Sequence, residues 1–198
     1  MSDVERAARA IADGKLAVYP TETVYGMGAN AVDAEAVERV FEVKGRDRDK
    51  PVSLGVPSVE RATEYVDPTD RELEFMREFL PGPVTVVVQR RDSVPDVLTA
   101  GREKVGVRVP DHDLALELFE AAGVPVTATS ANRSGTGSVR EILELSDEVR
   151  ERVSAVLDGG RTDGMESTVV DAESGAIHRR GAMADDIEAW LTEHAGAE

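Results

Sequence analysis

Two of the chain's four lysines, Lys44 and Lys50, lie in one seven-residue segment that also contains Arg46. An ammonium group supplies a compact positive charge, and a guanidinium group offers a planar fork that matches phosphate or carboxylate oxygens. A run of charges is more often a solvated face, and Asp47 and Asp49 could neutralise this one. Because lysine is scarce in this chain, its concentration here favours an anion-binding segment. The G-x-x-x-x-G-K-S/T pattern of a P-loop is absent, so this segment is not a P-loop.

Two other segments concentrate hydroxyl and amide groups at the ends of predicted strands. Residues 20–28 follow a buried strand, at the kind of strand end where α/β proteins commonly bind ligands. Residues 127–138 are rich in donors that can hold phosphate oxygens without a fixed charge. Ordinary turns with incidental hydroxyls are the alternative for both segments. The candidate donors are Thr23, Ser130, Asn132 and Ser138.

A third group of polar residues accompanies apolar strands. Arg108 is centred in the run Val-Gly-Val-Arg-Val-Pro, where burial is costly unless the guanidinium meets an anion or a carboxylate. A structural ion pair with one of the 39 acidic residues is the alternative for Arg108. Ser167 and Arg180 lie beside later strands and join the candidates. Neither G-x-S-x-G nor G-x-G-x-x-G after a strand is present, so the sequence indicates no α/β-type serine hydrolase and no dinucleotide site.

The composition restricts the available chemistry to hydroxyl, amide, carboxylate, lysine and arginine groups. The 198 residues include no cysteine, which excludes disulfides, thiolate metal sites and a cysteine nucleophile. The three histidines are scattered, which argues against a histidine-built zinc site. No apolar run approaches the ~20 residues of a membrane span, and no signal-peptide pattern opens the chain. We therefore expect a cytoplasmic protein without membrane contact.

The charge balance is strongly negative. Asp and Glu number 39 against 23 Lys and Arg, for a formal net charge of −16. Such a surface repels a polyphosphate backbone over most of its area, which disfavours generic nucleic-acid binding. The acidic excess, with arginine largely replacing lysine, also suggests a salt-adapted source.

Helical and strand-like periodicities interleave along the chain. They predict one α/β domain over residues 1–198, with a twisted mixed β-sheet and flanking helices. Strands are expected at 16–19, 52–56, 84–88, 105–109, 124–128, 153–157, 167–171 and 176–179. Helices are expected from Asp3, which would cap the first, to Gly14, then at 33–44, 73–80, 113–122, 139–145 and 185–194. The hydroxyl and amide candidates lie near strand ends, whereas Lys44, Arg46 and Lys50 lie at the end of the helix predicted at 33–44.

Seven motifs occur in an order that resembles the YrdC-like family of threonylcarbamoyl-AMP synthases, over roughly residues 3–194. They are residues 19–28 (YPTETVYGMG), 44–51 (KGRDRDKP), 81–85 (PGPVT), 107–110 (VRVP), 129–132 (TSAN), 167–171 (STVVD) and 180–181 (RG). The resemblance implies an α/β fold around a large, positively charged concave cavity. It also implies the single-domain form, because the chain is too short for the additional carboxy-terminal domain of longer members.

The resemblance further implies a nucleotidyltransferase that condenses L-threonine, bicarbonate or CO2, and ATP into threonylcarbamoyl-AMP and pyrophosphate. The product would supply the threonylcarbamoyl group for adenosine 37 of tRNAs that read ANN codons. It thereby suggests tRNA or the threonylcarbamoyl-transferase machinery as partners. Mg²⁺ would travel with ATP rather than occupy a dedicated protein cage. Nothing covalent is required of the protein, so positioning and charge stabilisation would supply the rate acceleration.

The matching motifs carry the family's site residues over position by position. A functional Lys-Arg-Ser-Asn tetrad falls on Lys44, Arg46, Ser130 and Asn132. ATP is assigned to Arg46, Lys50, Ser130, Ser138 and Arg180. Threonine is assigned to Thr23, Arg108 and Ser167, with Arg108 binding its carboxylate through two parallel hydrogen bonds. Gly55 departs from the pattern, since many members carry a histidine there, near the threonine.

The main alternative is an RNA-binding YrdC-like module without synthase turnover. The net charge of −16 and the aromatic content of 4% argue against that role. A second alternative is a carbamoyl-adenylate activity like that of hydrogenase maturation factors that process carbamoyl phosphate. Those chains are much longer and carry zinc-finger cysteines. The third is a regulatory ATP-binding protein without turnover.

Overall fold

The computed structural model describes residues 1–195, in which the strands form two sheets. The strands are β1 (Ala17–Tyr19), β2 (Gly26–Gly28), β3 (Ser53–Gly55), β4 (Val84–Gln89), β5 (Lys104–Arg108), β6 (Val126–Ala128), β7 (Ala155–Val156), β8 (Thr168–Asp171) and β9 (Ala176–Arg179). One sheet has the order β2-β1-β7 and the other the order β6-β3-β5-β4-β8-β9. Both mix parallel and antiparallel pairs, for example β4 antiparallel to β5 and parallel to β8. The predicted α/β class is confirmed, but the strands are divided between two sheets rather than one.

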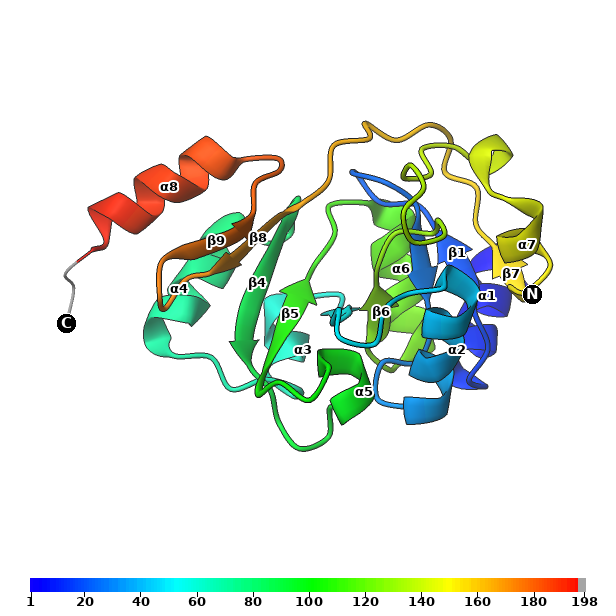
Figure 1. Ribbon diagram of the computed structural model, residues 1–198, viewed down its shortest axis with the longest axis horizontal. Coiled ribbons are helices and arrows are strands. Elements are labelled where there is room, and N and C mark those ends of the chain that lie inside the picture. The colour runs from blue at the N-terminus through cyan, green and yellow to red at the C-terminus, as the bar shows by residue number, and fades with distance from the viewer. Residues whose placement is uncertain (196–198) are drawn as a thin grey trace.

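The helices cover the outer faces of the two sheets (Figure 1). They are α1 (Asp3–Ala12), α2 (Ala34–Lys44), α3 (Val59–Ala62), α4 (Asp70–Phe79), α5 (Asp96–Thr99), α6 (Asp113–Ala122), α7 (Asp147–Arg150) and α8 (Ala184–Glu193). In Figure 1 the smaller sheet lies on the right with α1, α2 and α7, and the larger sheet extends towards α4 and α8 on the left. The connection from β7 to β8, residues 157–167, runs across the top of the molecule and joins the two sides.

Two of the predicted helices differ from the structure, the first in its capping residue and the second in its existence. The cap of α1 is Ser2 rather than Asp3, because the Ser2 side chain accepts from the Glu5 N–H and the Glu5 side chain accepts from the Ser2 N–H. The helix predicted at 139–145 is wrong, since only the short 3-10 helix η1 (Ile142–Glu144) forms there. The Val139 carbonyl instead accepts from the Tyr25 N–H at 2.8 Å, which ties this stretch to a distant segment.

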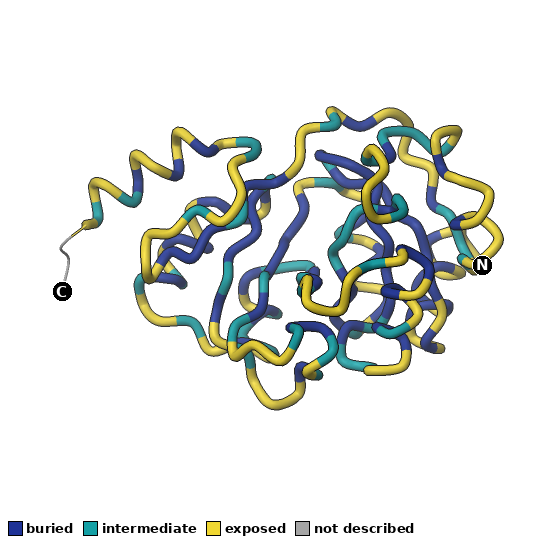
Figure 2. Tube along the Cα trace, viewed as in Figure 1, coloured by how far each residue is buried: buried dark blue, intermediate teal, exposed yellow. Residues whose placement is uncertain are grey.

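Alternation along the strands of the larger sheet separates its core face from its polar face. In β4, Val84, Val86 and Val88 pack into the largest apolar cluster, whereas Thr85 and Val87 face the opposite side. Successive side chains of a strand point to opposite faces of the sheet, so one apolar and one functional face result from a single segment. Figure 2 shows buried residues in dark blue, which dominate β4, whereas β9 at the edge of the sheet is mostly exposed.

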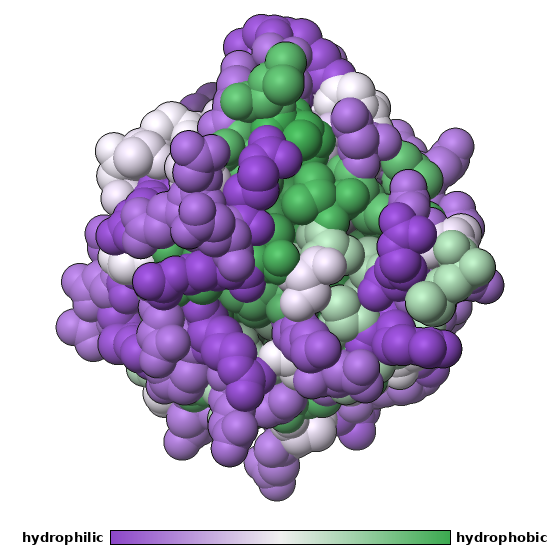
Figure 3. Space-filling view, turned by 90° about the vertical axis from the view of Figure 1, so that its right-hand side faces the viewer, coloured by the Kyte–Doolittle hydropathy of each residue, from purple (hydrophilic) through white to green (hydrophobic). Residues whose placement is uncertain are grey.

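The side of the molecule with the smaller sheet presents a mostly hydrophilic surface, interrupted by a hydrophobic strip through its middle (Figure 3). Beneath the surface, α1 and α6 pack on β1 through Tyr19 and Phe119, whose rings meet edge to face at 5.2 Å. Within residues 1–195, no helix combines the length and apolar character needed to cross a bilayer.

Candidate functional site

A cavity of about 620 Å³ is lined by residues from both sheets and from the loops that follow their strands. Its floor comes from the polar face of the larger sheet, and β1 with the loop after it supplies the opposite wall. Cationic side chains outnumber carboxylates in the lining, although the chain as a whole carries a net charge of −16. The charged lining residues are Arg46, Arg102, Lys104, Arg108, Arg179, Glu166 and Asp171. The expected positively charged hollow is therefore present.

Arg108 lies at one end of this cavity and is 7% exposed. Its guanidinium forms an ion pair with Glu22, and its Nη2 donates to the Thr23 hydroxyl at 3.3 Å. Its Nε is buried without a hydrogen-bond partner. Burial lowers the pKa of Arg108 to about 10, so the guanidinium stays charged at neutral pH. A buried charged group with an unused donor is costly unless an acceptor binds there, which makes this end suitable for a small carboxylate.

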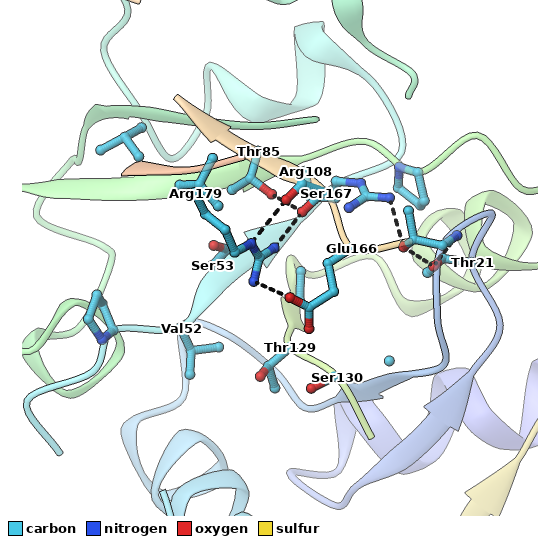
Figure 4. A pocket seen from close by; sticks show the side chains of 18 of the residues that line it. Thr21, Val52, Ser53, Thr85, Arg108, Thr129, Ser130, Glu166, Ser167 and Arg179 are labelled. Atoms are coloured by element: carbon cyan, nitrogen blue, oxygen red, sulfur yellow. Dashed lines mark hydrogen bonds and ion pairs between the residues drawn. The ribbon is translucent and has the colours of Figure 1, made fainter. Parts of the chain in front are cut away.

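Arg179 and Ser167 continue the network along the cavity (Figure 4). The Arg179 Nη2 donates to the Ser167 hydroxyl at 2.9 Å, and its Nε donates to the Ser167 carbonyl at 3.0 Å. The Ser167 hydroxyl lies 3.1 Å from the Thr85 hydroxyl on β4. Thr85 lies on β4, Ser167 directly precedes β8, and Arg179 is the last residue of β9. These three adjacent strands of the larger sheet hold the three side chains in place.

Lys44 and Arg46 flank Gly45 at the end of α2, where Arg46 lines the cavity and Lys44 lies behind the lining. Gly45 caps α2 in the left-handed conformation, with φ 55°, and turns the chain between them. The Lys44 ammonium is buried and donates to the carbonyls of Ser130 and Asn132. Burial, assisted by the nearby charge of Arg46, lowers the pKa of Lys44 to about 8.

Arg46 lines the cavity itself, with burial holding its pKa below the usual value. Its Nε donates to the Lys50 carbonyl at 2.9 Å and its Nη2 to the Pro51 carbonyl at 2.8 Å. Ser130 also lines the cavity, and its hydroxyl lies 3.5 Å from the Lys44 ammonium. This end therefore holds a charged fork and a hydroxyl, with a second positive charge directly behind the hydroxyl.

The remaining predicted residues divide into those behind the lining and those outside it. The Asn132 side chain donates to the Thr136 carbonyl at 2.7 Å, and its Oδ1 is buried without a partner. The Ser138 hydroxyl donates at 3.1 Å to Glu166, which does line the cavity. The predicted residues that line the cavity directly are Thr23, Arg46, Arg108, Ser130 and Ser167.

Lys50 and Arg180 do not line the cavity. The Lys50 side chain is exposed, and only its carbonyl takes part, as an acceptor for Arg46. Arg180 pairs with Asp185 and Glu188 at the surface of α8. Arg179, one residue earlier, faces the cavity instead, because neighbouring residues of an extended segment point in opposite directions. Of these two arginines, Arg179 and not Arg180 therefore lines the cavity.

Sequence reasoning missed Arg179, Thr85 and Glu166. Arg179 is the neighbour of the candidate Arg180, and Thr85 belongs to the PGPVT motif, so the sequence could have indicated both residues. Glu166 directly precedes the STVVD motif, but nothing in the sequence distinguishes it from the other acidic residues of a chain that has 39 of them.

Gly55 is explained by its contact with an aromatic ring. A Cβ at this position would lie 2.7 Å from Cε2 of Phe119, closer than side chains approach one another. Phe119 itself lines the cavity. An aromatic ring therefore fills the space beside β3, and no side chain is accommodated at Gly55.

Within residues 1–195, no group of three or more His, Asp or Glu side chains is placed to hold a metal ion. A metal ion bound here would thus need most of its ligands from a substrate or from water.

The sequence is similar to a known protein family and to several of its members. The sequence profile of the Sua5/YciO/YrdC family, described as "Telomere recombination", matches residues 9–181. A threonylcarbamoyl-AMP synthase of Pyrococcus abyssi is 42% identical over 167 residues, covering 83% of this chain and 49% of the relative. One of Bacillus subtilis is 35% identical over 191 residues, covering 95% and 52%. The chain thus spans about half the length of these two relatives. One of Vibrio campbellii is 31% identical over 186 residues, covering 91% of this chain and 100% of the relative.

Solved structures show the same fold. The crystal structure of P. abyssi Sua5 complexed with L-threonine has a TM-score of 0.86 and 38% identity, covering 91% of this chain and 55% of that one. Escherichia coli YciO, at 24% identity, shares the fold with a TM-score of 0.81, over 90% of this chain and 89% of that one. A family profile that extends over most of the sequence and relatives of this similarity lead to one conclusion: the chain belongs to the Sua5/YciO/YrdC family.

Proposed function

We propose that this chain is a threonylcarbamoyl-AMP synthase, an enzyme that joins L-threonine, bicarbonate or CO2, and ATP. The observation that carries the proposal is a single cavity with an anion-binding group at each end. Arg108 offers an unused buried donor at one end, and Arg46 with Ser130 offers a charged fork and a hydroxyl at the other. The printed names of the relatives and the L-threonine in the P. abyssi structure support the same assignment.

Threonine fits the end that contains Arg108. Its carboxylate would accept hydrogen bonds from the Arg108 guanidinium, while the hydroxyls of Thr23 and Ser167 lie within the same end of the cavity. Because Glu22 occupies part of the Arg108 fork, the threonine carboxylate would share the guanidinium with Glu22.

ATP fits the other end, where Arg46, Ser130 and Arg179 would hold its phosphates. Lys44 places a positive charge behind Ser130, and its hydrogen bonds to the Ser130 and Asn132 carbonyls hold this loop in position. ATP would enter as its Mg²⁺ complex, in which the metal ion offsets part of the phosphate charge. Mg²⁺ therefore counts as part of the substrate.

The reaction then needs two bond-forming steps. The threonine amine attacks CO2, an N–C bond forms and a proton leaves, which gives a carbamate. A carbamate oxygen attacks the α-phosphorus of ATP, a P–O bond forms, and the bond from the α-phosphorus to the bridging oxygen of the β-phosphate breaks and releases pyrophosphate. Both partners are anions, so the cationic lining offsets their repulsion and the protein acts by positioning and charge stabilisation.

The product would serve as the donor for threonylcarbamoyl transfer to tRNA, in the cytoplasm. A separate threonylcarbamoyl transferase would carry out this transfer. The tRNA, the transferase and the compartment remain predictions.

The purified protein should release pyrophosphate and form threonylcarbamoyl-AMP when it is incubated with ATP, Mg²⁺, bicarbonate and threonine in high KCl. Mass spectrometry identifies the adenylate, and an enzyme-coupled assay measures the pyrophosphate. Omission of threonine should abolish both products. Pyrophosphate release that is independent of threonine, or no release at all, would reject the proposal. An RNA-binding module would instead retain tRNA in a mobility-shift assay while it forms no adenylate.

A further inference from the structure

Glu166 places a carboxylate at the phosphate end of the cavity, a position that the proposed reaction does not explain. One of its oxygens accepts from the Ser138 hydroxyl at 3.1 Å, and the other lies 3.4 Å from Nη1 of Arg179. Figure 4 shows this carboxylate pointing into the cavity, between Arg179 on one side and Thr129 and Ser130 on the other. Its side chain is 46% exposed, so it is accessible to a ligand.

The backbone around Glu166 is held in place from both sides. Its carbonyl accepts from the Ala182 N–H at 3.0 Å, and the Gly164 N–H donates to the Thr23 carbonyl at 2.7 Å. Gly181 packs so closely that an added Cβ would lie 2.2 Å from the Glu166 carbonyl oxygen. The carboxylate therefore stays at the mouth of the phosphate end unless these contacts break, and only its side-chain torsions are free.

A fixed carboxylate at this position opposes the binding of a triphosphate. It uses donors, the Ser138 hydroxyl and the Arg179 guanidinium, that phosphate oxygens would otherwise use, and it repels their charge. A divalent cation bound between the carboxylate and the phosphates would attract both and so replace their mutual repulsion with a net attraction. Mg²⁺ commonly binds one or two protein carboxylates together with phosphate oxygens and water, which matches the single carboxylate available here.

Asp171, the other carboxylate in the lining, is not available in the same way. The Lys104 ammonium donates to it at 2.7 Å, and the Ser174 N–H donates to it at 3.0 Å. Burial alone would raise the pKa of Asp171, but these hydrogen bonds together lower it, so its charge is already compensated. Among residues 1–195, Glu166 pairs with the Ser138 hydroxyl at 3.1 Å and, more weakly, with the Arg179 guanidinium at 3.4 Å, and its half-exposed side chain remains accessible to a cation.

We propose that Glu166 contacts the Mg²⁺ that accompanies ATP and thereby makes the metal complex, rather than free ATP, the preferred ligand of the cavity. The inference rests on the proposed function, because it assumes that ATP binds at the end with Arg46 and Ser130. On binding, the carboxylate turns from Arg179 to the metal ion, and the Arg179 guanidinium becomes free for a phosphate oxygen.

The test is a thermodynamic cycle measured by calorimetry, with ATP but without threonine or bicarbonate. Dissociation constants are measured in excess Mg²⁺ and in EDTA for the unaltered chain, for Glu166→Gln and for Asp163→Asn. Asp163 lies on the same connection, is exposed and is absent from the lining, so this variant controls for the loss of one negative charge. We expect Mg²⁺ to tighten ATP binding at least tenfold in the unaltered chain and in Asp163→Asn. In Glu166→Gln the gain from Mg²⁺ should fall below threefold, and metal-free ATP should bind more tightly than it does to the unaltered chain.

An equal gain from Mg²⁺ in Glu166→Gln and in the unaltered chain overturns the inference. So does a uniform increase in affinity for both forms of ATP, because it means that Glu166 only repels phosphate. If the unaltered chain binds ATP in neither condition, the proposed function fails instead, and the two failures are thus distinguishable. Circular dichroism and thermal unfolding establish that each variant is folded, and Glu166→Ala, with the same expected result, replaces Glu166→Gln if the latter does not fold.

Discussion

The two ends of the cavity are built from different kinds of structure. At the end proposed for threonine, Arg108 projects from a strand inside the larger sheet and is held by Glu22 and Thr23 with little exposure to solvent. At the phosphate end, Arg46 projects from the loop after α2, and its donors are bonded to the carbonyls of Lys50 and Pro51. The Arg108 side chain is therefore fixed by buried side-chain contacts, whereas Arg46 must exchange hydrogen bonds to backbone carbonyls for contacts with phosphate.

This difference predicts how each substrate gains affinity. A pre-organised, buried donor loses little conformational entropy on binding, so each of its contacts contributes strongly. A donor that leaves an internal acceptor gains only the difference between two hydrogen bonds, and charge then decides the outcome. Threonine affinity should thus depend on single contacts, and ATP affinity on the total charge, on pH and on the metal ion.

The largest effect is expected for Arg108→Lys. Lysine keeps the positive charge but loses the fork and its Nε donor, and a hydrogen bond to a charged group contributes about 1.5–3 kcal/mol. Threonine affinity should fall about 10- to 150-fold in calorimetry, while ATP affinity changes less than about twofold. Arg102→Lys, at an exposed lining position, is the control and should leave both constants unchanged. An equal loss for the two substrates would show that the two ends are not independent.

The next effect is expected for Arg46→Ala. ATP affinity should fall about tenfold or more, because a cation in the lining is lost, but part of that loss is offset since its partner carbonyls can bind water. Lys50→Ala removes an exposed ammonium outside the lining and should change ATP affinity less than about threefold. Equal losses in both variants would mean that the whole segment 44–51, and not Arg46 in particular, binds the nucleotide.

The neighbouring arginines Arg179 and Arg180 allow a matched comparison. Arg179→Ala should weaken ATP binding about tenfold, because Arg179 contacts Glu166 and Ser167 inside the cavity. Arg180→Ala should leave ATP affinity unchanged, because Arg180 pairs with acids at the surface of α8. The reverse ranking in the same calorimetric assay would contradict the orientation of the two side chains.

A smaller effect is expected from pH. Because the pKa of Lys44 is lowered to about 8, its ammonium loses a proton as the pH rises through that value, and the positive charge behind Ser130 disappears. ATP affinity should therefore fall severalfold between pH 7 and pH 9. In Lys44→Arg the guanidinium stays charged, so the profile should be flat over this range. A rising or unchanged affinity in the unaltered chain would contradict this role of Lys44.

The smallest effect is expected from salt, away from the cavity. With a net charge of −16, the acidic surface repels itself, and added salt screens this repulsion. The midpoint of thermal unfolding should rise by a few degrees or more between millimolar and molar KCl. An unchanged midpoint would contradict the salt-adaptation hypothesis, but it would not bear on the proposed roles of the cavity residues.

Local signals in the sequence predicted part of this structure well. Helix α2 was expected at residues 33–44, because its apolar residues recur at helical spacing, and the structure places it at Ala34–Lys44. The strands β4 and β5 were expected because uninterrupted apolar runs are typical of buried strands. Arg108 was singled out because a charge in such a run must find a partner. Each of these inferences depends only on residues that are close together in the chain.

Features that depend on distant segments were not predictable in this way. The failed helix at 139–145 is bonded instead to the Tyr25 segment, more than a hundred residues earlier. The choice between Arg179 and Arg180 depends on the register of β9 against β8, which shifts at Val169/Val170. No local pattern encodes that register.

By itself, the sequence determined which chemical groups this protein has available: arginines, lysines and hydroxyls concentrated in a few segments of an otherwise acidic chain without cysteine. Only the tertiary structure decided which of them share one cavity, that Arg179 and not Arg180 enters it, and that Glu166 stands among the cations. The physical reason is that residue types and helical or strand periodicity are local properties. Strand pairing, side-chain direction and burial arise only when segments far apart in the chain pack together.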